Sequence, residues 1–443
     1  MQMTWTRYLP AFFRQRIEGK DYLQDIIGNT GWMLGDRIIR KALGLLVIIL
    51  IARHFGPQLF GDFSYAMAFV MIVSPIAMLA LDAVAIRRLV LDPDCRNEVL
   101  GTSFIMMIGG GVLAFSLAMA AIFIVRPDER LVQWLVGILA ASTIVQASIA
   151  IEFWFESQMQ WKFTVYAKTS AFLLLSLVKI CLILLKAPLV AFAWAGLAET
   201  VVGSVGLLIV YQWRGYSIKA WRFSWATAGT MLRDSWPLTF TTLLAMIYLR
   251  IDQVKLGIMS GKEQVGFYAA AVRITEVNFI QVVISGSVLP AIISARKVSE
   301  ELFYARMQKL YNLMAFISYL IAIPIMLFSS RIVSILFGSS YQTSGPLLAI
   351  LIWAGLFSSL DAARRISMVA QNWLRIDLMA TFLACALNIL LNFYLIPTHG
   401  AMGAVIASII SYWFAVHGTC LIFKPLHKTG WMLTKAMIYP KIW

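Results

Sequence analysis

Runs of about twenty apolar residues, separated by short polar segments, recur along the whole chain of 443 residues. An α-helix of this length crosses the hydrocarbon core of a bilayer. A helix on the surface of a soluble core carries a polar face, and most of these runs have none. The pattern therefore predicts an all-α polytopic membrane protein with about twelve transmembrane helices. The predicted spans are 30–53, 60–84, 100–125, 131–153, 164–185, 188–211, 236–258, 265–291, 309–329, 345–368, 376–396 and 400–423.

Composition agrees with this reading, since 60% of the residues are hydrophobic and only 13% are charged. Soluble globular chains carry about 25% charged residues. The net charge of +15 raises the alternative of a nucleic-acid-binding protein. However, the basic residues lie mainly in short loops between apolar runs, and no basic, aromatic-interleaved soluble face is left to bind a phosphate backbone. We expect no nucleic-acid partner.

The loops alternate sharply in Lys and Arg content, with 24 in one set and 6 in the other. Basic loops remain on the cytoplasmic side of a membrane. The alternation predicts a protein of the cytoplasmic (inner) membrane with both termini in the cytoplasm. A missed span would reverse the pattern beyond it, so the regular alternation also favours an even number of spans.

A long polar loop after the sixth predicted span divides the chain into two lobes of six helices. The predicted domains are a cytoplasmic N-terminal segment at 1–28, an N-lobe at 29–211, a cytoplasmic inter-lobe linker at 212–235, a C-lobe at 236–423 and a cytoplasmic tail at 424–443.

The two lobes share a short repeat, because residues 52–68 align without gaps on residues 257–273. In this alignment Gly56 falls on Gly261 and Gly61 falls on Gly266. An even number of spans per half predicts a parallel repeat, related by an axis along the membrane normal. The alternative is that both segments are generic glycine-rich turns.

Seven basic residues remain inside the predicted spans once the loops are subtracted. They are Arg37, Arg40, Lys41, Lys179, Arg250, Lys255 and Arg273. A charge at the centre of a span costs at least about 2.5–3.5 kcal/mol on insertion scales, so each should face water or a partner. In the first span Arg37, Arg40 and Lys41 share one helical face, and Asp36 can pair with Arg40 four residues on.

In the second lobe Arg250 and Arg273 lie at similar depth on neighbouring antiparallel spans if the chain turns near residue 260. We expect Glu276 to pair with Arg273, and Asp252 to face another helix and meet Arg273 there. Structural salt bridges between helices are the alternative to a binding site. Lys179 and Glu199 are assigned to structural pairing or snorkelling.

No metal site and no cofactor are expected, because the four histidines lie at span ends without metal-binding neighbours and no Walker A sequence is present. An enzyme such as a glycan polymerase would need long extracytoplasmic loops with catalytic residues, and the longest candidate, at about 330–345, offers little chemistry. We expect that the chain is not an enzyme.

Two stretches carry a family resemblance. They are RIDQVKLGIMSGKEQVGFYAAAVRITE at 250–276 and NTGWMLGDRIIRKALGLLVIILIARHFGPQLFGDFSYAMAF at 29–69, with LDAVAIRRL at 81–89 between the second and third spans. They resemble Wzx-type polysaccharide flippases of the multidrug/oligosaccharidyl-lipid/polysaccharide (MOP) exporter superfamily. The resemblance implies a MATE-like, V-shaped pair of lobes around a central cavity. It also implies export of an undecaprenyl-pyrophosphate-linked oligosaccharide to the outer leaflet, for O-antigen of lipopolysaccharide, capsule or exopolysaccharide.

The resemblance carries over to particular residues, since Arg250, Asp252 and Arg273 match the family's charged pattern and Arg37 and Arg40 match its cationic first span. We expect the arginines and Lys41 to bind the diphosphate, because guanidinium groups donate paired hydrogen bonds to phosphates. Asp36, Asp252 and Glu276 then serve in ion coupling or in structural pairing.

The sequence leaves three alternatives for the energy source of transport, which are the membrane potential, a proton gradient and a sodium gradient. The expected partners are the lipid-linked oligosaccharide, membrane lipids, a polysaccharide polymerase and glycosyltransferases, with the transporter itself monomeric. Two alternatives come from the same superfamily. A lipid II flippase would usually carry two further spans, and a drug/cation antiporter would need a cavity with net acid.

Overall fold

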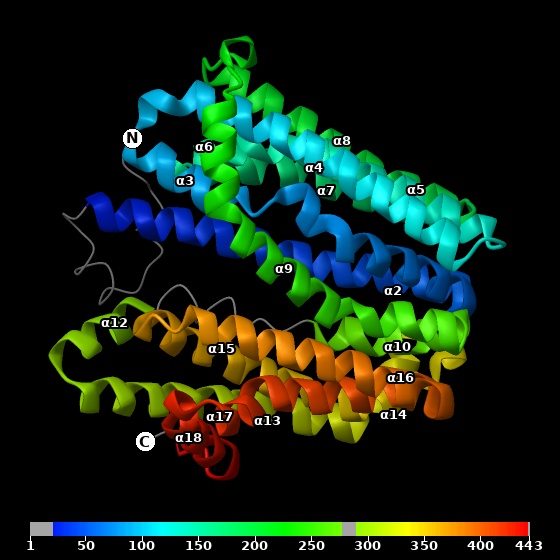
Figure 1. Ribbon diagram of the computed structural model, residues 1–443. Helices are drawn as coiled ribbons and strands as arrows, with labels where there is room; N and C mark the ends of the chain where they lie inside the picture. The colour runs from blue at the N-terminus through cyan, green and yellow to red at the C-terminus, as the bar shows by residue number, and fades with distance from the viewer. Residues whose placement is uncertain (1–20, 277–288, 442–443) are drawn as a thin grey trace.

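In the computed structural model, which describes residues 21–276 and 289–441, almost every described residue is helical and none lies in a strand (Figure 1). The main helices of the first half are α2 (Asp21–Met78), α3 (Leu81–Leu91), α4 (Arg96–Val125), α5 (Arg130–Val145), α6 (Ala150–Ser157), α7 (Trp161–Leu184) and α8 (Leu189–Trp213). Those of the second half are α9 (Trp225–Met259), α10 (Lys262–Thr275), α12 (Leu289–Val298), α13 (Glu300–Phe337), α14 (Ser344–Leu351), α15 (Ala354–Gln371), α16 (Leu374–Trp413), α17 (Thr419–Ile422) and α18 (His427–Ile438).

Eight helical segments among the described residues are long and apolar enough to cross a membrane. Two of them, Ile38–Leu91 and Arg375–Ile422, are 54 and 48 residues long, about twice what a bilayer requires. Each contains a glycine with a positive φ, Gly56 at 71° and Gly400 at 55°, where one helical arm ends and the next begins. The all-α polytopic fold is confirmed, whereas the count of twelve spans stays a prediction because 277–288 lies outside the described residues.

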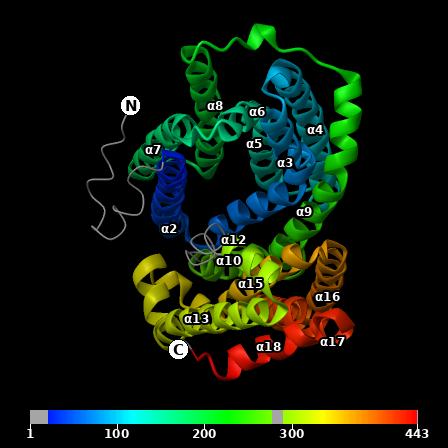
Figure 2. The ribbon, with the colours of Figure 1, turned by 90° about the vertical axis from the view of Figure 1, so that its left-hand side faces the viewer.

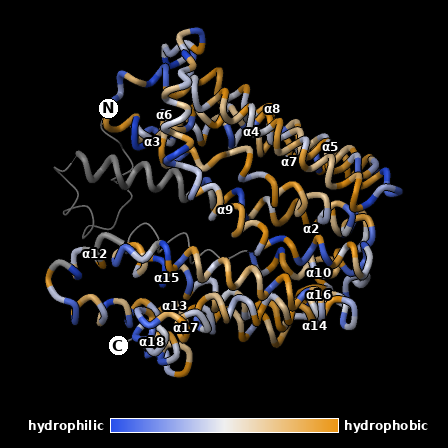
Figure 3. The backbone as a smooth tube through the Cα atoms, in the orientation of Figure 1, coloured by the Kyte–Doolittle hydropathy of each residue, from blue (hydrophilic) through white to orange (hydrophobic). Residues whose placement is uncertain are grey.

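The outer faces of the helices are apolar, as the bilayer requires. Large side chains such as Leu177, Ile209 and Leu320 are more than half exposed around the bundle. Hydrophilic residues gather at the helix ends (Figure 3). In a soluble protein this surface would aggregate, so it is the lipid-facing surface of a membrane protein.

The helices form two groups, which diverge on one side of the molecule and meet on the other (Figure 1). Helices α2–α8 make up the N-lobe, and α10 with α12–α18 makes up the C-lobe. Helix α9 runs from the N-lobe, where it packs on α3 and α4, to the C-lobe, where it packs on α16 (Figure 2). It begins at Trp225, so the predicted linker at 212–235 contributes the first turns of this helix.

The repeat is visible in the backbone. Gly56 and Gly261 both have a positive φ, 71° and 85°, and each ends one helical arm and starts the next. Only glycine adopts this conformation at little cost. The second arm of α2 then begins at Pro57, and α10 begins at Lys262, the residue that matches Pro57 in the alignment.

The two lobes touch most closely where these matching arms cross. A Cβ on Gly61 would lie 1.8 Å from the Lys262 carbonyl oxygen, and a Cβ on Gly266 would lie 2.0 Å from the Pro57 carbonyl oxygen. The contact is reciprocal, because Gly61 matches Gly266 and Pro57 matches Lys262. Small residues let membrane helices approach backbone to backbone. The repeat is therefore a two-fold arrangement of the lobes about this crossing.

Two hydrogen bonds next to the crossing follow the same symmetry. The Tyr341 hydroxyl, in the turn between α13 and α14, donates to the Ala52 carbonyl oxygen at 2.9 Å. The Arg126 guanidinium, between α4 and α5, donates to the Gly257 carbonyl oxygen. Ala52 and Gly257 occupy matching positions of the repeat. The C-lobe thus binds a backbone carbonyl of α2, and the N-lobe binds the matching carbonyl near the end of α9. We call this pair of bonds the inter-lobe latch.

Candidate functional site

A cavity of about 490 Å³ lies between the N-lobe and the end of α10. Its wall combines apolar side chains of α2, α5, α7 and α8 with a set of charged ones. The charged residues are Arg40, Lys41, Lys179, Glu199, Arg273 and Glu276. Four cations face two carboxylates, so the wall is net positive. We call this space the cationic cavity.

Arg40 is held in place with one donor left over. Its Nε donates to Asp36 at 2.7 Å, and its guanidinium carbon lies 5.3 Å from the ring centroid of Phe172. Asp36 also accepts a bond from the Thr169 hydroxyl. The Nη2 atom of Arg40 is buried and has no hydrogen-bond partner among the described residues. An orphaned buried donor costs free energy unless a ligand or water satisfies it.

The structure describes the side chain of only one of the other two basic residues predicted on this face of the first span. Lys41 lines the cavity with an exposed side chain and takes part in none of the ion pairs of the described residues. Arg37 lies in α2, but its side chain is outside the part of the chain that the structure describes. The predicted pairing of Asp36 with Arg40 is confirmed.

Lys179 and Glu199 form an ion pair of 2.7 Å between α7 and α8, as the structural assignment predicts. They also line the cationic cavity, which the sequence did not indicate. Glu199 and Arg40 border a second space of about 260 Å³ deeper in the N-lobe. The position of the pair along the sequence could have indicated this, because both residues lie well inside apolar helices, where an ion pair needs water or a cavity nearby.

The C-lobe side of the cavity is organised around one carboxylate. Glu276 accepts from Arg250 on α9 at 2.7 Å and from Arg273 on α10 at 3.3 Å. The two arginines therefore lie at similar depth, as predicted, and Glu276 pairs with Arg273, as predicted. Arg273 lines the cationic cavity, whereas Arg250 is absent from its wall and supports it through Glu276.

The prediction that Asp252 meets Arg273 is wrong. Asp252 is buried in the C-lobe and accepts hydrogen bonds from Tyr268 at 2.9 Å, Ser408 at 2.5 Å and Asn392. It lies two residues from Arg250, and this spacing turns the two side chains to different sides of α9. The carboxylate thus packs against α16, and three neutral donors take the place of a cation.

The arrangement suits a ligand with a compact anionic group. Guanidinium and ammonium groups from three helices converge on one space whose remaining wall is apolar, and a low-dielectric wall strengthens each charge interaction. The same wall would repel an organic cation.

Solved transporter structures share this fold. The inward-facing conformation of a multidrug resistance MATE family transporter of the MOP superfamily matches with a TM-score of 0.71 and 16% identity, over 88% of this chain and 96% of that one. The inward closed conformation of the lipid II flippase MurJ matches with a TM-score of 0.68 and 13% identity, over 91% and 90%. At these identities the likeness shows the fold alone. The fold and the cavity define a multi-pass, all-α membrane protein built from two lobes.

Sequence comparison adds the family. Residues 26–296 match the model of the polysaccharide biosynthesis protein family, so the chain belongs to that family. It is also 26% identical over 170 residues to the probable low-salt glycan biosynthesis flippase Agl15 of Haloferax volcanii. That alignment spans 37% of this chain and 35% of the length of its relative. These similar proteins are named as flippases and transporters, not as enzymes.

Proposed function

We propose that this protein is a Wzx-type flippase, which moves an undecaprenyl-pyrophosphate-linked oligosaccharide repeat unit from the inner to the outer leaflet of the cytoplasmic membrane. The cationic cavity is the observation that carries the proposal. Its free donors come from guanidinium and ammonium groups, which match the oxygens of a diphosphate. Membership of the polysaccharide biosynthesis family and the flippase relative favour a glycan as the cargo.

In this mechanism the diphosphate binds between Arg40, Lys41 and Arg273, while the lipid tail stays in the bilayer. Arg250 acts through Glu276 to hold Arg273 in position. The lobes meet at the end that carries the loops poor in Lys and Arg, which the positive-inside rule places outside the cell. The cavity in this arrangement opens toward the cytoplasm, and alternating access requires the inter-lobe latch to break.

The proposal also includes the energy source for transport. Moving a negative charge out of a negative-inside cell gains about 2.3 kcal/mol per charge per 100 mV. The buried Asp252 carboxylate is the candidate for a proton or sodium contribution. A buried carboxylate carries its charge at a cost in free energy, and a bound proton or sodium ion would offset that cost.

The test uses purified protein in liposomes with a fluorescent undecaprenyl-pyrophosphate-linked disaccharide, whose appearance in the other leaflet is followed with a membrane-impermeant quencher. Arg40→Gln and Arg273→Gln should each lower the initial rate at subsaturating substrate by about tenfold or more, since a hydrogen bond to a charged group contributes about 1.5–3 kcal/mol. Arg331→Gln, at an exposed cation of α13 outside the cationic cavity, is the matched control and should keep the wild-type rate.

Wild-type rates in both cavity variants, at normal protein levels, would refute the site. The two superfamily alternatives appear as different outcomes of the same assay. Faster movement of lipid II than of the lipid-linked disaccharide would favour a lipid II flippase. Efflux of an organic cation that survives Arg40→Gln would favour a drug antiporter.

A further inference from the structure

A separate cavity, of about 280 Å³, lies in the C-lobe between α9, α15 and α16. It shares no lining residue with the cationic cavity. The polar side chains that matter for its chemistry are Tyr248, Asp361, Arg365, Thr381 and Tyr412. Its volume falls just below the range of about 300–1,000 Å³ for small-molecule sites, so it fits a single ring and not an oligosaccharide.

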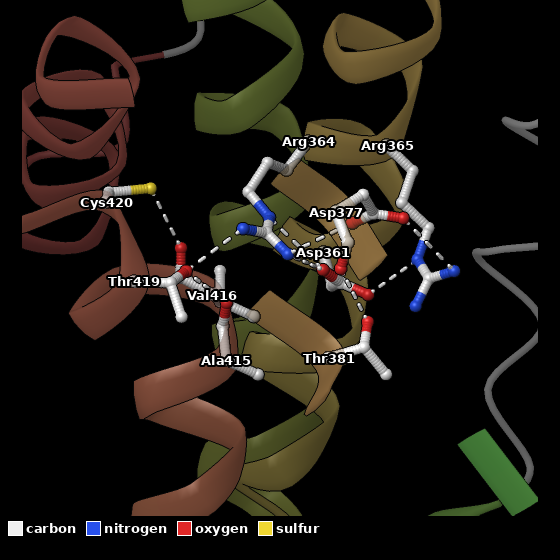
Figure 4. A network of polar contacts seen from close by, with 9 residues as sticks. All are labelled: Asp361, Arg364, Arg365, Asp377, Thr381, Ala415, Val416, Thr419 and Cys420. Atoms are coloured by element: carbon white, nitrogen blue, oxygen red, sulfur yellow. Dashed lines mark hydrogen bonds and ion pairs between the residues drawn. The ribbon is translucent and has the colours of Figure 1, made fainter. Parts of the chain in front are cut away.

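Three residues of this cavity's wall, Asp361, Arg364 and Arg365, belong to a polar network that also includes Asp377 (Figure 4). Asp361 accepts from Arg364 Nη2 and from Arg365 Nε, both at 2.9 Å. Asp377 lies 3.5 Å from Arg364 Nη2 and 3.9 Å from Arg365 Nη1. The network has no net charge, so it offers directional donors and acceptors without the field that a phosphate group requires.

The two arginines have different tasks. Arg364 is only 2% exposed, points toward α17 and donates to the Thr419 hydroxyl at 3.2 Å, so it holds helices together. Arg365 leaves α15 on the other side and is 48% exposed. Its Nε donates to Asp361 and its Nη1 forms the 3.9 Å ion pair with Asp377, whereas its Nη2 makes no hydrogen bond or ion pair within the described part of the chain. Nη2 is therefore free to donate to a ligand.

The wall also carries two aromatic side chains. The rings of Tyr248 and Tyr412 meet edge to face with centroids 5.1 Å apart, and both residues line the cavity. The Tyr248 hydroxyl is buried and has no hydrogen-bond partner among the described residues. A buried hydroxyl without a partner is costly, and a ligand hydroxyl in the cavity would satisfy it.

The chemistry selects one class of ligand. A pyranose ring presents an apolar C–H face, which packs on aromatic rings, and a rim of hydroxyl groups, which pair with guanidinium, carboxylate and phenol groups. Leu249, in the wall of this cavity, directly precedes Arg250, which is paired at 2.7 Å with Glu276 in the wall of the cationic cavity, so the two cavities are neighbours. A glycan attached to a diphosphate in the first cavity could therefore place a sugar in the second.

We propose that this C-lobe cavity is a sugar subsite, which binds one uncharged pyranose residue of the transported glycan through Tyr248, Tyr412 and Arg365. The proposal rests on the proposed function, because it takes the sugar to be part of a lipid-linked glycan.

The experiment measures binding to the purified full-length protein in detergent by saturation-transfer NMR. The probes are free glucose, galactose, mannose and N-acetylglucosamine, with inorganic pyrophosphate as the probe of the cationic cavity. At least one sugar should bind at millimolar concentration. Tyr248→Phe, which removes a hydroxyl that has no protein partner, and Arg365→Gln should each weaken its binding about fivefold or more. Tyr394→Phe, on an exposed tyrosine of α16, and Arg40→Gln should leave sugar binding unchanged.

The outcomes separate the two proposals. Pyrophosphate binding that is lost in Arg40→Gln, together with sugar binding that is absent or indifferent to Tyr248→Phe and Arg365→Gln, would overturn the subsite and leave the proposed function standing. Loss of pyrophosphate binding in Tyr248→Phe or Arg365→Gln would make this cavity an anion site and would also overturn the subsite. Absence of pyrophosphate binding to the wild-type protein would count against the proposed function, whereas sugar binding tests the subsite by itself.

Discussion

Replacing Gly266 by alanine should loosen the crossing that joins the two lobes. The added Cβ would lie 2.0 Å from the Pro57 carbonyl oxygen and 2.8 Å from the Pro57 carbonyl carbon, against an ordinary contact of 3.4 Å or more. Both are backbone atoms of a helix, so no side chain can rotate away, and α10 must move by about 1 Å or more. Such overpacking costs about 1–3 kcal/mol. Because 1.4 kcal/mol is tenfold, a cost of about 2 kcal/mol shifts the equilibrium about thirtyfold away from this arrangement of the lobes.

The assay is electron-electron distance measurement between spin labels at Gln212, in the last turn of α8, and Glu301, in the first turn of α13, which are both exposed. The background replaces Cys95 and Cys181 by serine, because these two cysteines are not buried. The Gly266→Ala variant should gain a population with a shorter distance, since lobes that separate at the crossing close at the other end.

Gly109→Ala is the matched control. This glycine also lies in a membrane helix, but a Cβ there meets no atom within 4 Å, so the variant should keep the wild-type distances. The combination of Gly61→Ala with Gly266→Ala should cost less than the sum of the two, because one displacement relieves both clashes. Identical distance distributions for Gly266→Ala and Gly109→Ala would refute the reasoning.

Four further variants test other parts of the structure. Tyr341→Phe removes the hydrogen bond to Ala52, which contributes about 0.5–1.5 kcal/mol to this arrangement of the lobes. The variant should therefore gain a smaller population with the shorter distance, and an unchanged distribution would mean that the latch does not hold the lobes. Asp252→Asn replaces an acceptor of three hydrogen bonds by an amide that cannot accept all three, so it should destabilise the protein by about 1–3 kcal/mol in thermal unfolding, and an equal melting temperature would contradict the described cluster. Arg364→Gln should cost about 1.5–3 kcal/mol, because it removes a buried guanidinium that donates to Asp361 and Thr419. Arg365→Gln, at a half-exposed position, should cost about 1 kcal/mol or less, and equal losses in melting temperature would refute this division.

Much of the fold followed from the sequence because the bilayer imposes its own length scale. Apolar runs of about twenty residues mark helices that cross a membrane, and no soluble fold needs them in this number. The glycine pair at 56 and 261 also followed, since an unbroken helix could not return across the membrane there. The break at Leu79 and Ala80, between α2 and α3, did not follow. Both residues have a positive φ, 50° and 42°, and neither is a glycine, so nothing local predicts the bend.

Only part of the candidate site could be predicted from the sequence. Spacing along one helix correctly paired Asp36 with Arg40 and Glu276 with Arg273, because residues three or four apart share a helical face. Spacing could not tell which helix that face would meet. The sequence therefore sent Asp252 to Arg273, whereas the structure buries it against α16.

The sequence by itself determined the membrane environment, the repeat and the small set of charges that topology leaves inside the spans. These follow from composition and period, which do not depend on how the helices pack. The tertiary structure decided which charges share a space. It brought Lys179 and Glu199 to the wall that holds Arg40 and Arg273, and it moved Arg250 behind Glu276. A helix fixes the direction of each side chain about its own axis, but only packing against other helices fixes what that side chain faces.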